Sequence, residues 1–140
     1  MTQPLLAALR ARLVADAGLA ALLPAYRGAP AVFTGTPLPA DAPLPAVVLA
    51  AASEDRPLPL QAFALRRLRL PVVCWARDTA ARPDLDDLAA RVRRLLEAPD
   101  LAFTGGRVLA LAVEGPAQQP AVAGLRARRL TVQLLLEEEQ

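Results

Sequence analysis

The segment LRRLRLPVVCWAR, residues 65–77, restricts the possible folds more than any other part of the sequence. Its residues alternate between two sets, which an extended chain places on opposite faces. The apolar set is Leu68, Leu70, Val72 and Cys74, and the other set is Arg67, Arg69, Val73 and Trp75. This period of two predicts a long strand with one face in a core. The only cysteine then points inward and the only tryptophan points outward, so the two do not share a catalytic site.

Four further apolar runs predict strands, and they lie at residues 31–34, 46–52, 107–115 and 124–139. In the last run the apolar phase shifts by one residue at Arg128 and Arg129, which predicts a bulge. Residues 53–61, from Ser53 to Gln61, are polar and rich in proline. They predict a protruding loop within a long hairpin, because such a segment does not suit the interior of a sheet.

Two segments have the apolar spacing of amphipathic helices, residues 4–23 and 84–98. Gly18 predicts a bend or a short second piece in the first, and Asp87 and Arg91 have the spacing of an ion pair in the second. The order of elements predicts one α+β domain over residues 1–140. We expect an antiparallel sheet of about four to five strands with two helices packed on one face. A functional surface is then expected on the other face.

The residue inventory excludes the common catalytic and metal sites. Histidine is absent, which removes Ser-His-Asp and Cys-His pairs and histidine metal ligands. No segment matches a phosphate-binding loop or a dinucleotide fingerprint. Asp84, Asp86 and Asp87 could suggest a magnesium site, but their place at a helix start favours a role in complementing the helix dipole. We therefore expect no catalytic residue, no cofactor and no metal, and a protein that is not an enzyme.

Composition restricts the environment and the partners. No apolar stretch approaches the roughly 20 residues that cross a bilayer, and the N-terminus lacks the pattern of a signal peptide. We expect a soluble, cytoplasmic protein without membrane contact. All 16 basic residues are arginine, but 14 acids reduce the net charge to +2. This charge is smaller than the basic excess typical of a nucleic-acid-binding domain.

Arginines gather on the two longest predicted strands and are the main candidates for an assembly interface. Like charges on neighbouring strands repel each other unless acids meet them, and the chain has few acids nearby. Glu54, Asp55 and residues 137–139 are the obvious partners, and in a ring they could come from an adjacent copy of the chain. Contact with DNA is the competing use of the same arginines. The full candidate interface is Glu54, Asp55, Arg56, Arg66, Arg67, Arg69, Trp75, Arg126, Arg128 and Arg129.

Six segments in order carry a resemblance to a known family. They are LLAALRARLVADAGLAALL, AVFTGTPLPADAPLPAVVLA, LRLPVVCWARD, DLDDLAARVRRLLEA, GGRVLALAVEG and GLRARRLTVQLLLEEE. Together they resemble the tail-terminator, or tail-completion, family of long-tailed bacteriophages and gene transfer agents. The resemblance spans nearly the whole chain, and its motifs are patterns of apolar and turn residues rather than signature side chains.

The resemblance implies a structural protein of the virion tail or neck, assembled in the host cytoplasm. It implies a homo-oligomeric ring, usually a hexamer, that caps the tail tube and stops its growth. The implied partners are the tail-tube protein, the head–tail connector or stopper protein, and DNA that passes through the ring lumen without sequence-specific binding. Family members have no catalytic residues to transfer to this chain.

Other functions fit the same sequence. One is a different neck component, such as a stopper or connector subunit. Another is a free-standing α+β module that holds a small molecule on the face around Trp75, which predicts a monomer or dimer with a concave pocket. An enzyme that uses Cys74 or the aspartates would show a reactive thiol in the folded protein.

Overall fold

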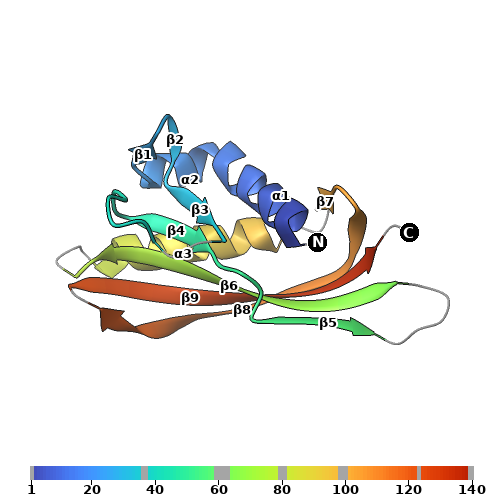
Figure 1. The fold of residues 1–140 in the computed structure, drawn as a ribbon. Helices are drawn as coiled ribbons and strands as arrows, with labels where there is room; N and C mark the ends of the chain where they lie inside the picture. The colour runs from blue at the N-terminus through green and yellow to red at the C-terminus, as the bar shows by residue number, and fades with distance from the viewer. Residues whose placement is uncertain are drawn as a thin grey trace.

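A computed structural model describes residues 2–35, 38–58, 64–78, 82–97, 101–122 and 124–138. Three helices lie on one face of a long, twisted sheet (Figure 1). No helix in these ranges lies on the other face, which we call the open face. The α+β class and the placement of the helices on one side are therefore confirmed.

The helices are α1 (Thr2–Ala15), α2 (Ala17–Leu22) and α3 (Arg82–Leu96). The expected break in the first helix is confirmed, and Asp16 explains it: its backbone is extended and its carboxylate accepts a hydrogen bond from the N–H of Leu19 at 2.8 Å. This is the geometry of a helix N-cap, so α2 begins anew. The fully buried side chains of α1 and α3 are Leu5, Leu6, Leu9, Leu13, Leu85, Leu88, Ala89, Val92 and Leu96.

The main sheet has seven strands rather than the expected four or five. Its spatial order is β3 (Val32–Thr34), β4 (Ala46–Leu49), β6 (Leu65–Arg77), β9 (Leu125–Glu138), β8 (Gly106–Val122) and β7 (Ala102–Phe103), with β5 (Glu54–Leu58) paired to β6. The β3 and β4 strands are parallel and the other pairs are antiparallel, so the sheet is mixed. A separate hairpin is formed by β1 (Ala25–Tyr26) and β2 (Ala29–Pro30).

The β6 and β9 strands form the centre of the sheet. Their pairing runs without a break from Leu65 opposite Glu137 to Arg77 opposite Leu125. The even-numbered apolar residues of both strands face the helices and are buried, as the alternation predicts: Leu68, Leu70, Val72, Cys74, Leu130, Val132, Leu134 and Leu136. The odd-numbered residues lie on the open face.

The expected bulge at Arg128 and Arg129 is wrong, because the β9 register against β6 is continuous there. The irregularities lie in the neighbouring strand β8, which has three register shifts against β9. One of them lies between Glu114 and Ala117, where Gly115 has a φ of 101°. A glycine tolerates this conformation without the steric cost that a Cβ would add.

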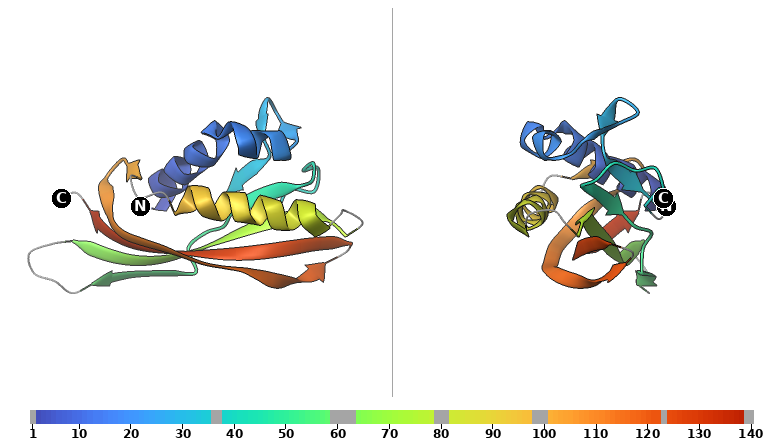
Figure 2. Two further views of the ribbon diagram at one scale, coloured as in Figure 1. Left: turned by 180° about the vertical axis from the view of Figure 1, so that it is seen from behind. Right: turned by 90° about the vertical axis from the view of Figure 1, so that its left-hand side faces the viewer.

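The expected loop after Ser53 is also corrected. Residues 54–58 form strand β5, which pairs antiparallel with the first part of β6, and residues 59–61 lie outside the described ranges. Pro57 is compatible with this strand because β5 lies at an edge of the sheet, where a missing N–H donor is tolerated. The β5–β6 hairpin extends sideways beyond the helices (Figure 2).

Candidate assembly interface

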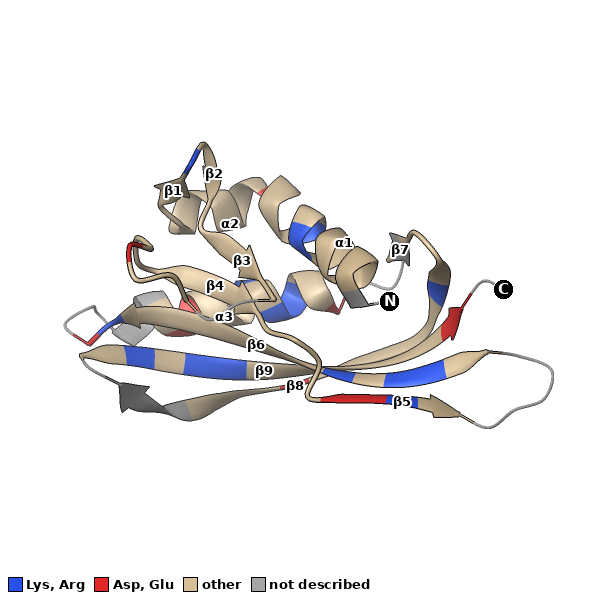
Figure 3. Ribbon diagram, viewed as in Figure 1, with Lys and Arg blue, Asp and Glu red and all other residues tan. Residues whose placement is uncertain are grey.

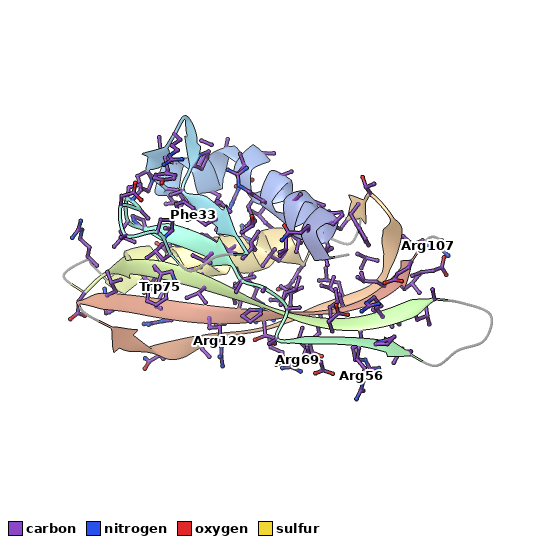
Figure 4. The ribbon with its side chains drawn as sticks, viewed as in Figure 1. Phe33, Arg56, Arg69, Trp75, Arg107 and Arg129 are labelled. Carbon is purple, nitrogen blue, oxygen red and sulfur yellow. The ribbon has the colours of Figure 1, made fainter. Side chains whose placement is uncertain are left out.

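Strand register divides the candidate arginines between the two faces of the sheet. Arg67 and Arg69 of β6 have the odd-numbered phase of the open face. Arg56 of β5 lies directly opposite Arg67, and Arg129 of β9 lies opposite Val73, so both share that face. Figure 4 shows Arg56, Arg69 and Arg129 extending from the sheet away from the helices.

Arg126 and Arg128 lie on the helix face instead. The side chains of both are only 12% exposed. The Nε of Arg126 lies 3.6 Å from Oδ1 of Asp78, and the Nε of Arg128 lies 3.2 Å from Oδ1 of Asp86 on α3. Their long aliphatic stems cover the sheet while the guanidinium groups reach carboxylates at its border. Arginine can therefore occupy two positions that face the helices, as the buried Leu130 does.

Arg66 is likewise paired within the chain. Its Nε donates to Oδ1 of Asp55 at 2.7 Å, and its Nη1 lies 3.2 Å from Oε1 of Glu138. The hydrogen bond to Asp55 raises the pKa of the Arg66 guanidinium. Three of the expected acids therefore do meet an arginine of the same chain: Asp55 and Glu138 meet Arg66, and Glu137 meets Arg107.

Four of the candidate arginines thus have acidic partners within the chain. Arg66, Arg126 and Arg128 have partners within the chain, and Arg69 has one as well: its Nη2 lies 3.7 Å from Oε2 of Glu114, which also accepts a hydrogen bond from Gln133. The sequence missed Glu114, Asp78 and Asp86 as partners because their proximity depends on strand register. Whether the candidate residues lie in a subunit interface stays a prediction.

Arg56, Arg67 and Arg129 differ from these four. All three are exposed, and none has an ion pair within the described ranges. Figure 3 shows most of the basic residues of β6 near the β5–β6 hairpin and those of β9 at the opposite end of the sheet, where β6 ends with Arg77. Beside the hairpin lies a shallow groove of about 520 Å³, and its polar lining is Glu54, Arg67, Arg69 and Gln133.

Trp75 does not belong to this groove. It lies on the open face opposite Ala127 and next to Ala46, and it is half-buried. It lies six positions after Arg69 along β6, a distance of about 20 Å at the rise of an extended strand. The open face therefore holds two separate regions: an arginine region, formed by Arg56, Arg67 and Arg69, and a region around Trp75 that includes Arg129.

A second groove, which sequence reasoning missed, lies at the β1–β2 hairpin. It has a volume of about 360 Å³ and is lined by Arg10, Tyr26, Arg27 and Phe33 among others. The Tyr26 and Phe33 rings meet edge to face with centroids 5.0 Å apart, and the Arg27 guanidinium lies 5.2 Å from the Tyr26 centroid. Arg27 has a φ of 52°, a conformation that is uncommon for a residue other than glycine.

The described residues offer neither a reactive thiol nor a metal site. Cys74 is fully buried, and this burial raises the pKa of its thiol to about 12. Within the described ranges, no three His, Cys, Asp or Glu side chains are grouped so that they could hold a metal ion. None of the described helices is long and apolar enough to cross a membrane.

The fold and this surface define a small α+β domain with a helix-covered sheet and an arginine-rich open face. A family model described as "Tail completion protein gp17" matches residues 7–134. The chain belongs to this family of tail completion proteins, and the resemblance found in the sequence is confirmed. The protein is a structural component of a virion, located in its tail or neck.

A solved structure supports the assignment over the same length. The chain matches one described as "Virion of native gene transfer agent (GTA) particle" with a TM-score of 0.77 and 25% sequence identity. The match covers 96% of this chain and 95% of that chain. Among curated proteins, none matches the chain.

Proposed function

We propose that the protein is a non-enzymatic subunit of a homohexameric ring that caps the tail tube, ends its polymerisation and provides the joining surface for the head connector. The observation that carries this proposal is the match over 96% of this chain to a protein of a gene transfer agent virion, together with membership of the tail completion family. The proposed partners are five further copies of the chain, the tail-tube protein and the connector or stopper protein. DNA passes through the lumen of this ring.

Surface properties are consistent with a ring. A ring formed by rotation uses two different patches of each subunit, one facing each neighbour. The region around Trp75 and the groove at Tyr26 and Arg27 are two such patches, and both carry the aromatic and arginine side chains that are enriched at the centres of interfaces. We propose these two regions as the subunit contacts.

The proposal is tested by removing the protein from a particle-producing cell and imaging the tails. We expect tails of irregular and excessive length, with heads that are not joined to them. Purified protein added to the extract should restore tails of uniform length. Tails of normal length on heads that fail to join would assign the protein to the stopper or connector position instead.

Oligomeric state gives an independent test. Light scattering of the purified protein, alone or with tail-tube protein, should detect a particle of six chains of 14.8 kDa each. Tyr26→Ala should weaken this assembly, whereas Leu22→Ala, which changes another exposed residue of the helix layer, should not. A protein that stays monomeric even with tube protein present would contradict the ring.

A further inference from the structure

Three arginines of the open face, Arg56, Arg67 and Arg129, have no ion pair with any described residue. Arg56 and Arg67 are directly opposite each other on β5 and β6. Residues so placed have Cβ atoms about 5 Å apart, and like charges in this position destabilise a sheet. Arg129 is exposed on the same face of β9. Within the described ranges, Glu54 and Glu114 are the carboxylates beside Arg56, Arg67 and Arg69, so the arginines outnumber the acids in this part of the open face.

A second copy of the chain cannot easily neutralise these arginines. Most of the described carboxylates already pair with arginines of their own chain: Asp16, Asp55, Asp78, Asp86, Glu97, Glu114, Glu137 and Glu138. Asp41, Glu54 and Asp87 are the other described carboxylates, and Asp41 already accepts a hydrogen bond from Tyr26. Among the described residues, few carboxylates are therefore left to meet the open face of a second copy, which favours a different anionic molecule.

The spacing of the arginines favours an extended polyanion. Arg67 and Arg69 are two residues apart on one strand, about 6.6 Å, and Arg56 lies opposite Arg67 on the neighbouring strand β5. A single carboxylate would reach one or two of these groups. Duplex DNA, with one negative charge for about each 1.7 Å of its axis, would reach all of them.

The composition of this region also distinguishes DNA from an acidic protein. Protein interfaces concentrate their binding energy in buried aromatic and arginine anchors. The arginine region holds no aromatic residue among its lining side chains, and its apolar part consists of alanines and leucines of β8 and β9. Dispersed, exposed guanidinium groups on a flat sheet are suited to sequence-independent contact with phosphates.

We propose that the open face around Arg56, Arg67 and Arg69 binds the phosphate backbone of duplex DNA without regard to sequence. The orientation of this face toward the lumen rests on the proposed ring, but the binding itself does not. With so few contacts the affinity is low and decreases steeply with salt. A weak, salt-dependent contact lets DNA move along the surface, as passage through a ring requires.

The test is fluorescence anisotropy of a labelled duplex of scrambled sequence, titrated with the full-length protein at several salt concentrations. The logarithm of the binding constant falls with the logarithm of the salt concentration by about 0.9 for each phosphate contact. Loss of one contact should therefore lower the affinity by about eightfold at about 0.1 M salt. We therefore expect Arg67→Gln to weaken binding by about this factor and Arg67→Lys to retain most of it. Arg94→Gln is the matched control, because Arg94 is an exposed arginine of α3 in the opposite layer, and it should leave binding unchanged.

Several outcomes would overturn the inference. The first is that the wild-type protein does not bind the duplex at low salt. The second is that Arg67→Gln and Arg94→Gln lower the affinity for the duplex equally while both variants melt at the wild-type temperature. Tighter binding of polyglutamate than of the duplex would assign the face to an acidic protein.

Light scattering of each variant separates this inference from the proposed function. If Arg67→Gln abolishes ring assembly, the open face is a subunit contact and the DNA inference fails. If no ring forms but DNA binding still depends on Arg67, only the ring proposal fails.

Discussion

The β6–β9 ladder has arginine pairs at both ends, and the two ends use them differently. At the α3 end, Arg126 and Arg128 lie on the helix face, 12% exposed, and reach Asp78 and Asp86. At the β5 end, Arg67 and Arg56 lie on the open face, exposed and without an ion pair in the described ranges. The comparison shows that the phase of a residue on its strand, rather than its charge, decides whether it serves the fold or the surface.

The largest expected effect tests how much the helix layer contributes at the α3 end. Leu130→Ala should lower the free energy of unfolding by about 3 kcal/mol, because Leu130 is fully buried and the change leaves a cavity. Leu135→Ala removes a half-buried leucine from the open face and should cost about 1 kcal/mol. Urea unfolding of both variants measures the difference. Equal losses would show that the open face is as well packed as the core.

Two neighbouring arginines of β9 sharpen the same comparison. Arg128→Ala should destabilise the fold by about 1 kcal/mol, because it removes a well-packed stem and the partner of Asp86. Arg129→Ala, one residue further and on the open face, should stay within about 0.5 kcal/mol of the wild type. Thermal unfolding of both variants at equal protein concentration measures this difference in stability. A larger effect for Arg129 would place it inside a packed region.

The reactivity of Cys74 shows whether the end of the sheet near α3 holds a functional thiol. We expect no reaction with a thiol reagent in the folded protein near neutral pH, because burial raises the pKa of Cys74 to about 12. Reaction should follow when urea unfolds the chain. Cys74→Ala should cost roughly 1 kcal/mol and leave tail completion intact. Loss of completion with an unchanged melting curve would reveal a role in function.

The smallest expected effect concerns the attachment of α2 to α3, and it appears only in acid. Arg91 Nε and Nη2 donate to the two carboxylate oxygens of Asp16 at 2.9 and 3.0 Å. This hydrogen bonding, followed by that from the Leu19 N–H, lowers the pKa of Asp16. Because the folded pKa lies below the unfolded one, the carboxylate stabilises the fold above the unfolded pKa, and this contribution is lost as pH falls through the folded pKa.

Asp16→Asn keeps an acceptor for the helix cap but has no charge to lose. Its stability in urea should therefore change less than that of the wild type between about pH 5 and about pH 2. Glu97→Gln, which removes an exposed acid paired with Arg93 on the surface of α3, serves as the control and should follow the wild type. Identical acid profiles for all three proteins would show that the Asp16–Arg91 pair does not couple the helices.

Local periodicity was sufficient to predict the helices, the central strands and the direction of Cys74, because these properties depend on neighbouring residues. The β5 strand was missed because Pro57 indicates a loop unless the strand is known to lie at an edge. Arg91 was expected to pair with Asp87 four residues away, but it pairs with Asp16, 75 positions away. Such partners follow from helix packing and strand register, which no short segment encodes.

The three register shifts of β8 have a consequence for the solubility of the free subunit. Within the described ranges, the outer edge of β8 pairs only with β7, at Gly106 and Arg107, and most of the remaining edge is exposed. A straight strand of this length would offer other copies a row of free backbone groups for aggregation. The shifts bend and interrupt that row, and Pro116 lacks an N–H donor. These features are therefore expected to hinder the growth of free copies into fibres through the β8 edge.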